Sequence, residues 1–288
     1  EKVYNKIDDL MKSGNITEAI DYLNDQIKEK KIPELYNELG NIYFSKEDYE
    51  KALEEYEKAL EIDENHIESL YNKANVLFKI YGDSNNAIKL LNKALEIDQN
   101  NYQVLTFLGE IYLLKRKLKK ALDCFTKSVS LNEDNYLGYF GIGNVYCAKE
   151  NYDKAISYYN KAIEINSEIA AVYNMRGLCY KKLRKYDKVL DDFYKAIELD
   201  PKYANAYFNL ADELDRKRRY EDAVKYYKKV VELNSLDDMA YNNMGYSYFK
   251  MKKYENALEC YEKALEINPN NKYAVANKKQ VEVYLKNK

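Results

Sequence analysis

The side chains best suited to catalysis are scarce in this chain of 288 residues, which has one histidine and four cysteines. The histidine, His66, follows Asp63-Glu64-Asn65 in a polar connection, so we expect it to be a solvated loop residue. The cysteines are Cys124, Cys147, Cys179 and Cys260. None of them forms the CxxC pair that zinc sites and thioredoxin-type redox sites use. We therefore expect no metal site.

Sequence motifs for cofactor and covalent chemistry are also missing. The sequence contains no GxGxxG, no GxxxxGK[ST] and no GxSxG motif, which are the signatures of dinucleotide, P-loop and α/β-hydrolase sites. Carboxylates are abundant, but their positions single out no acid/base pair. We expect a chain that is not an enzyme and binds no cofactor.

The composition excludes further classes. Lys and Arg total 46 against 48 Asp and Glu, and this balance does not favour a general binder of nucleic acid or membrane surfaces. No apolar run approaches the roughly 18–20 residues of a membrane span, and no secretory leader opens the chain. The absence of these signals and the scattered, reduced thiols predict a cytoplasmic protein. Apolar residues at 46% and charged residues at 33% suit a helical protein with much solvated surface.

One pattern recurs every 34 residues along most of the chain. Its small residues are Gly40, Ala74, Gly109, Gly143, Gly177, Ala211 and Gly245. Large residues precede them by four positions, at Tyr36, Leu70, Leu105, Tyr139, Tyr173, Tyr207 and Tyr241. A second set of large residues lies further on, at Tyr56, Leu91, Phe125, Tyr159, Phe193, Tyr227 and Tyr261. The unit that contains Ala74 has one extra residue, near Tyr81-Gly82-Asp83.

Spacings of three and four within each set place its residues on one face of a helix, so each unit predicts two helices. Small residues allow the two helices to approach closely, and the large ones fill the gaps. A turn is expected between the helices, as at Lys46-Glu47-Asp48, and another after each unit, at Asp200-Pro201 and Asn268-Pro269. Proline suits the first turn of the next helix, with the preceding Asp or Asn as its N-cap. Because one hairpin cannot bury both faces, neighbouring units must stack into a continuous core.

This pattern resembles that of the tetratricopeptide repeat (TPR) proteins, with tyrosine at the fourth position where the family often has tryptophan. Seven units match, at 33–66, 67–101, 102–135, 136–169, 170–203, 204–237 and 238–271. Residues 1–32 resemble a degenerate eighth unit, and 272–288 a capping helix. The resemblance implies an all-α superhelix, or solenoid, that forms a single domain over residues 1–288. It also implies that the first helices line a concave groove that binds peptides.

The candidate groove residues flank the motif face of each first helix. They are Asn37, Asn41, Asn72, Asn75, Phe107, Glu110, Phe140, Asn144, Asn174, Met175, Leu178, Asn209, Asp212, Asn242, Asn243, Tyr246 and Asn277. An asparagine amide has a donor and an acceptor, so a row of them can hold an extended backbone without reading its sequence. The superhelical repeats of O-linked N-acetylglucosamine transferases resemble this arrangement. The alternative is that the chain is simply rich in asparagine.

Apolar residues interrupt the amides in the middle of the chain. They are Phe107, Leu113, Leu114, Leu137, Phe140, Cys147, Met175 and Leu178. An apolar patch there would suit the hydrophobic side chains of a partner helix. The alternative is that these residues pack on neighbouring helices, because the groove and core faces adjoin.

The resemblance also allows a check of the carboxylate clamp found in chaperone-binding relatives. Asn37, Asn41 and Asn72 match its asparagines, but Gln103 and Phe107 stand where its cations belong. A C-terminal carboxylate would therefore lack a strong counter-ion. Basic residues gather in the turns inside the units and acidic ones in the connections between units, which predicts one basic and one acidic rim. We do not expect nucleic acid on the basic rim, because no stacking-aromatic motif accompanies it.

Two functions of different classes fit the sequence. The first is a non-catalytic scaffold that binds a peptide or helical segment of a partner protein in its groove. The second is the substrate-recognition region of a larger enzyme such as a glycosyltransferase, because the chain begins at Glu1 and its repeats run nearly from end to end. Weak self-association through the first unit or the final helix is a third option.

Overall fold

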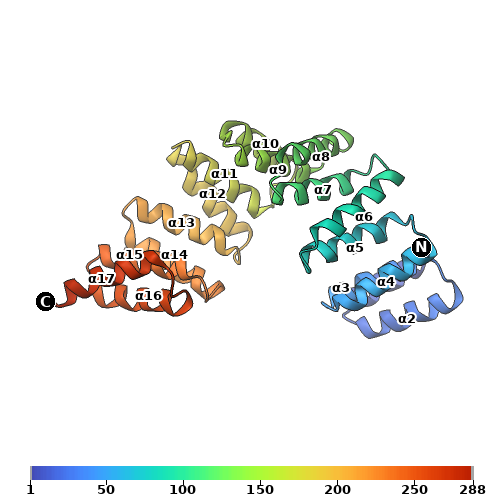
Figure 1. The fold of residues 1–288 in the computed structure, drawn as a ribbon, viewed down its shortest axis with the longest axis horizontal. Coiled ribbons are helices and arrows are strands. Elements are labelled where there is room, and N and C mark those ends of the chain that lie inside the picture. Colours follow the sequence, from blue (N-terminus) through green and yellow to red (C-terminus); the bar gives the residue numbers. More distant parts are fainter. Residues whose placement is uncertain (1, 287–288) are drawn as a thin grey trace. The chain divides into compact units, whose positions relative to one another are not determined.

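The structure is a computed structural model that describes residues 2–286. The described residues form 17 α-helices and no strand, so the all-α expectation is confirmed (Figure 1). The helices are α1 (Lys2–Lys12), α2 (Ile16–Glu29), α3 (Pro33–Ser45), α4 (Tyr49–Ile62), α5 (Ile67–Lys79), α6 (Ser84–Ile97), α7 (Tyr102–Leu114), α8 (Leu118–Leu131), α9 (Tyr136–Ala148), α10 (Tyr152–Ile165), α11 (Ala170–Lys182), α12 (Tyr186–Leu199), α13 (Ala204–Arg216), α14 (Tyr220–Leu233), α15 (Asp238–Lys250), α16 (Tyr254–Ile267) and α17 (Lys272–Lys286). Odd-numbered helices up to α15 are the first helices of eight successive hairpins.

Small residues set the closeness of the two helices in a hairpin. A Cβ atom added at Gly143 of α9 would lie 2.5 Å from Cε1 of Tyr159 in α10, and one at Gly40 of α3 would lie 2.5 Å from Cε1 of Tyr56 in α4. Both rings are buried. The small residue of the repeat therefore works as expected, by letting an aromatic ring of the second helix lie against the backbone of the first.

The turn inside most hairpins contains one residue in the left-handed region. These residues are Glu47, Arg116, Glu150, Arg184, Arg218 and Lys252, with φ between 57° and 61°. In the first such turn Glu47 N–H donates to Phe44 C=O at 3.0 Å and Asp48 N–H donates to Tyr43 C=O at 2.9 Å. This pair of bonds satisfies the last carbonyls of α3 and turns the chain toward α4.

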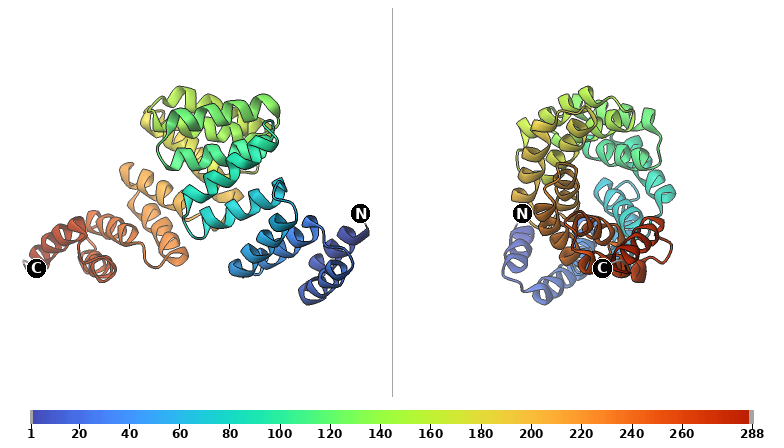
Figure 2. Two further views of the ribbon diagram at one scale, coloured as in Figure 1. Left: turned by 45° about the vertical axis from the view of Figure 1, so that its right-hand side comes forward. Right: turned by 90° about the vertical axis from the view of Figure 1, so that its left-hand side faces the viewer.

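The described chain divides into two compact units, one ending at Asp134 and one beginning at Asn135. In the first unit, α1 to α8, Leu23 and Leu39 belong to a core shared by the first three helices. In the second unit, α9 to α17, Tyr159, Phe193 and Tyr227 belong to one large core. Within each unit, successive hairpins lie side by side (Figure 2). A single domain over 1–288 stays a prediction, and residues 1, 287 and 288 of that range lie outside the described chain.

Two local expectations were wrong. His66 is buried rather than solvated: it is the N-cap of α5, and its Nδ1 lies 3.3 Å from Ser69 N and 2.8 Å from Ser69 Oγ. Pro201 and Pro269 lie in the connecting turns and not in the first turns of α13 and α17. The Asp or Asn before each proline instead accepts a hydrogen bond from the backbone two residues on, which closes the turn.

Candidate functional site

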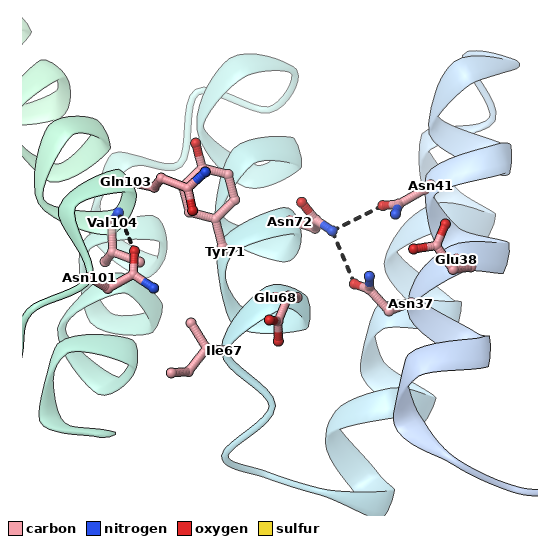
Figure 3. A pocket seen from close by; sticks show the side chains of 10 residues that line it. All are labelled: Asn37, Glu38, Asn41, Ile67, Glu68, Tyr71, Asn72, Asn101, Gln103 and Val104. Carbon is pink, nitrogen blue, oxygen red and sulfur yellow. Dashed lines mark hydrogen bonds between the residues drawn. The ribbon is translucent and has the colours of Figure 1, made fainter. Parts of the chain in front are cut away.

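Three successive first helices of the first unit, α3, α5 and α7, line a pocket of about 330 Å³ together with the connection that leads into α7 (Figure 3). Its lining residues are Asn37, Glu38, Asn41, Ile67, Glu68, Tyr71, Asn72, Asn101, Gln103 and Val104. Three of the expected groove asparagines, Asn37, Asn41 and Asn72, are therefore brought together. They come from two hairpins, so the pocket exists only where hairpins stack.

The amides of this pocket bind one another across the gap between helices. Asn72 Nδ2 in α5 donates to Asn37 Oδ1 and to Asn41 Oδ1 in α3, each at 3.0 Å (Figure 3). Tyr56 OH, from α4, donates to Asn41 Oδ1 at 2.9 Å, and Ser69 Oγ donates to Asn37 Oδ1 at 3.2 Å. Both hydrogens of the Asn72 amide are used, while its Oδ1 takes no part in these bonds. The asparagines thus fasten α3 to α5 and hold each other in fixed positions.

The same link occurs twice in the second unit. Asn209 Nδ2 donates to Asn174 Oδ1 at 2.9 Å, and Asn277 Nδ2 donates to Asn242 Oδ1 at 3.1 Å. In all three links the donor follows the acceptor by 35 residues. Sequence reasoning placed these residues on one face but missed that they pair. The sequence contains a signal for this pairing, because at each site a second asparagine follows the first by 35 residues, which is one repeat length plus one residue.

The carboxylates of the first-unit pocket have no cation beside them in its lining. Burial raises the pKa of Glu38, a hydrogen bond from the Asn41 side chain lowers it, and the charge of Asp8 raises it again. Glu68 is exposed, with one carboxylate oxygen 3.5 Å from His66 Nε2. Burial also raises the pKa of Tyr71, with a further contribution from Glu110. Among the described lining residues none is Lys or Arg, so the pocket is acidic and rich in amides.

Two candidate residues of the second unit, Asp212 and Tyr246, and a nearby pair that was not among the candidates form polar contacts. Asp212 makes an ion pair with Lys181 of the preceding hairpin. Ser247 Oγ donates to Asp215 Oδ1 at 2.5 Å, and burial raises the pKa of that carboxyl. Tyr246 is exposed, with Lys250 Nζ 4.9 Å from the centre of its ring. This face therefore carries mixed charge, unlike the acidic pocket of the first unit.

The apolar candidates are divided between core and surface. Phe107 is only 4% exposed, because the rings of Tyr71 and Phe78 in α5 cover it at 5.3 and 5.7 Å between centroids. It offers almost no surface to a partner. Phe140, Met175 and Leu178 are half-buried against the core of the second unit. Leu114 and Leu137 are exposed.

The remaining candidates lie on first helices as expected. Asn144 Oδ1 accepts a hydrogen bond from Tyr159 OH at 2.8 Å, Asn75 and Asn243 are half-buried, and Glu110 is exposed. The described residues contain no group of three or more His, Cys, Asp or Glu side chains that could hold a metal ion. No helix between residues 2 and 286 is both long and apolar enough to cross a membrane.

The stacked hairpins, with polar side chains of successive first helices in contact, define a tandem helical-repeat protein. Family profiles described as "Tetratricopeptide repeat" match residues 67–101, 102–135, 136–168, 170–203, 193–225 and 239–271, and one described as "TPR repeat" matches 40–80. The chain belongs to the tetratricopeptide repeat family. No curated protein sequence matches it.

The solved structures of several proteins are similar to the chain. YrrB, described as a TPR protein with an unusual peptide-binding site, is 26% identical with a TM-score of 0.54, over 66% of this chain and 97% of YrrB. A tetratricopeptide repeat protein from Parabacteroides merdae is 20% identical with a TM-score of 0.68, over 86% of this chain and 98% of that one. Yeast Tom70 is 19% identical with a TM-score of 0.61, over 94% of this chain and 59% of Tom70. The last two similarities show the fold alone.

Proposed function

We propose that this chain is a non-catalytic interaction scaffold that holds a peptide or helical segment of a partner protein along its first helices. A role in protein interaction is general for the TPR family, and YrrB is described as having a peptide-binding site. The observation that carries the proposal is the pocket between α3, α5 and α7, where amides from two hairpins are fixed by hydrogen bonds to each other.

Fixed amides favour binding for an entropic reason. Ordering a flexible side chain at an interface costs about 0.5–1.5 kcal/mol, and here the interhelical bonds have already restricted the side chains of Asn37, Asn41 and Asn72. The Asn72 Oδ1 atom is an acceptor that suits a backbone N–H of an extended segment. A row of such contacts gives affinity for a backbone with little demand on its sequence.

The charge of the pocket favours a basic side chain in the bound segment. Glu38 and Glu68 line the pocket without a Lys or Arg, and the half-buried Glu38 is poorly solvated. A lysine or arginine of the partner would supply the missing charge, and its stem could lie along the Tyr71 ring. An acidic C-terminal tail would meet repulsion, in agreement with the missing clamp cations at Gln103 and Phe107.

A displayed library of random peptides would test this proposal. Wild-type chain should enrich peptides with Lys or Arg at one fixed position. The double variant Glu38→Gln, Glu68→Gln should lose that preference and bind the selected peptides at least about tenfold more weakly, since one charged pair at a desolvated site is worth over about 1.4 kcal/mol. A matched control is Glu61→Gln, Glu64→Gln, which removes two exposed carboxylates from the end of α4 and the connection after it. Failure to enrich any peptide, or equal binding by both double variants, would contradict the proposal.

A further inference from the structure

Three turns of the second unit, each between the two helices of a hairpin, are strongly basic. They join α11 to α12, α13 to α14 and α15 to α16, and we define residues 181–185, 216–219 and 250–253 as the basic edge (Figure 1). Eleven of these thirteen residues are Lys or Arg, and none is Asp or Glu. The whole chain has a net charge of −2, so this edge departs sharply from its overall balance.

The three turns lie next to one another. Near the turns, α11 is joined to α13 by the ion pair of Lys181 with Asp212, and α13 is joined to α15 by the hydrogen bond from Ser247 Oγ to Asp215 Oδ1 at 2.5 Å. Helices in contact have axes about 8–10 Å apart, so the three turns span about 20 Å. The cations therefore form one continuous surface rather than three separate patches.

Intramolecular ion pairs neutralise only part of the basic edge. Four of its cations are paired with a carboxylate, at Lys181–Asp212, Lys185–Asp153, Arg216–Glu213 and Arg219–Asp222. Four others are exposed and form no ion pair within residues 2–286, namely Lys182, Arg184, Lys217 and Arg218. Positive charge therefore stays available to a partner.

Helix stability explains some of these cations but not those at the N-caps. The negative end of the first-helix dipole favours a cation in its last turn, such as Lys181. The last residue of each turn is instead the N-cap of a second helix, at the positive end of its dipole, and it is Lys185, Arg219 or Lys253. None of the three makes a cap hydrogen bond, because their side chains have no acceptor. Asn151, the N-cap of α10, accepts one from the backbone.

The middle residue of each turn is also unfavourable for stability. Arg184, Arg218 and Lys252 have φ of 59°, 61° and 61°, in the left-handed region that favours glycine. Glu150, in the preceding turn of the same unit, has φ 57°, so this conformation does not itself require a cation. Two adjacent positions of each turn thus carry a cation where another residue would stabilise the chain more. Residues that oppose local stability in this way are expected at binding surfaces.

We propose that the basic edge is a second interaction surface, which binds an extended acidic segment of a partner protein. An extended chain advances about 3.3 Å per residue, so about six residues cover the roughly 20 Å between the outer turns. Carboxylates at every third position would then meet one turn each. Arg184 and Arg218 can each bind a carboxylate through two parallel N–H groups. This surface lies in the second unit, so it does not depend on what the pocket of the first unit binds.

The surroundings of the turns favour a peptide over nucleic acid or a membrane. Tyr186, after the first turn, is covered by the guanidinium of Arg216, whose central carbon lies 3.7 Å from the ring centre, and Tyr254 stacks on a ring of α17. These two rings are already occupied and do not offer a platform for bases. The apolar residues of the turns, Leu183 and Met251, pack against the core of the second unit, so neither is exposed for insertion into lipid.

Fluorescence anisotropy with a labelled oligoglutamate peptide of about twelve residues, which is long enough to span the three turns, tests the proposal. Wild-type chain should bind this peptide at low ionic strength and release it as salt is added, because exposed charges are screened. The variant Arg184→Gly, Arg218→Gly, Lys252→Gly should bind about eightfold more weakly, which is about twofold for each exposed contact. It should also unfold at a higher urea concentration, because glycine relieves three left-handed residues. Weaker binding by a more stable chain cannot result from misfolding.

The matched control is Lys195→Gln, Lys229→Gln, Lys263→Gln, which removes three cations from the same hairpins near the far ends of α12, α14 and α16. It should bind the peptide within about twofold of the wild type. No binding by the wild type, or an equal loss in both triple variants, would overturn the proposal. Tighter binding of a single-stranded oligonucleotide of the same length, or of phosphatidylserine vesicles, would overturn it too, and so would a lower urea midpoint for the glycine variant.

Discussion

A buried ion pair in the second unit, Arg176 with Asp192, allows a direct test of how much a polar contact between helices contributes to stability. Arg176 in α11 donates from Nε to Asp192 Oδ2 at 2.9 Å, from Nη2 to Asp192 Oδ1 at 2.6 Å, and from Nη1 to Asn160 Oδ1 at 2.7 Å. The side chains of Arg176 and Asp192 are 18% and 7% exposed. The pair therefore joins α11 to both helices α10 and α12 with little contact with water.

The variant Arg176→Met removes the cation and keeps most of the side-chain volume. It leaves Asp192 with a buried charge, and breaking such a pair costs about 3–5 kcal/mol. This cost has an upper limit, because Asp192 can take up a proton and lose its charge instead of staying buried and unpaired. At pH 7 this protonation costs about 4 kcal/mol, because each pKa unit is worth about 1.4 kcal/mol and the ordinary aspartate pKa lies about three units below. We therefore expect a loss of about 3–4 kcal/mol in the free energy of unfolding at pH 7.

Because the cost of protonating Asp192 depends on pH, the stability lost in Arg176→Met should also depend on pH. Burial already raises the pKa of Asp192 in the presence of Arg176, and removal of the cation raises it further. A carboxyl whose folded pKa lies above its unfolded pKa binds more protons when folded, so stability rises as the pH falls toward the unfolded pKa. The deficit of the variant should shrink to about 1–2 kcal/mol at pH 5, because protonation there costs about 1.4 kcal/mol for each of roughly 1.1 units.

Urea unfolding followed by circular dichroism at 222 nm, at pH 7 and pH 5, measures both quantities. The matched control is Arg219→Met, which breaks the exposed pair with Asp222, whose two side chains are 51% and 44% exposed. Because water screens this pair, the control should lower stability far less than Arg176→Met does. The double variant Arg176→Met, Asp192→Leu should recover most of the stability, since no buried charge remains. A deficit that is the same at both pH values, or no larger than that of the control, would refute this reasoning.

Three further predictions concern the contacts within and between hairpins, each measured by urea unfolding. Asn72→Ala removes two interhelical hydrogen bonds and should lower the free energy of unfolding by about 1–2 kcal/mol. A double-mutant cycle with Asn37→Ala should show a coupling energy above about 0.5 kcal/mol, and additive effects would contradict the link between the two side chains. Gly143→Val places a branched side chain against the Tyr159 ring and should lower the free energy of unfolding by about 1–3 kcal/mol. An unchanged urea midpoint would contradict this, because it would mean that α9 and α10 can separate without loss of stability. Arg116→Gly relieves a left-handed residue at φ 58° and should stabilise the chain by up to about 1 kcal/mol.

The matched control for the last of these predictions is Lys117→Gly, one position further along the same turn. Lys117 is the N-cap of α8 with φ −85°, so glycine relieves no strain there and only adds freedom to the unfolded chain. It should leave stability unchanged or lower it by about a few tenths of a kcal/mol. Equal stabilisation by Arg116→Gly and Lys117→Gly would contradict the argument from the left-handed residue.

The sequence predicted the hairpins well because their determinants are local. The interval between Gly143 and Gly177 and the rings at Tyr159 and Phe193 depend only on helix geometry, and the structure places them as expected. The predictions for His66 and Phe107 were wrong because the burial of a side chain depends on residues of other helices, which the local pattern does not specify. His66 capped a helix that an aspartate would usually cap, and the exposure of Phe107 depended on which rings of the preceding hairpin covered it.

The candidate site was predicted less completely than the fold. The asparagines of the first helices were placed on one face, but a single helix does not reveal that Asn72 reaches back to Asn37. Contacts of this kind require the distance between stacked hairpins, which spacing along one helix does not give. The groove contacts with a partner, the cytoplasmic location, self-association and the interpretation as part of a larger enzyme stay predictions.

The close approach of each glycine to its ring also bears on how fast the chain folds. Gly143 and Tyr159 are sixteen residues apart, as are Gly177 and Phe193, and Gly245 and Tyr261. Closing such short loops costs little entropy, and chains dominated by contacts of this kind fold in microseconds to milliseconds. Each hairpin is therefore a place where folding can begin, and its neighbours can add to it in either direction.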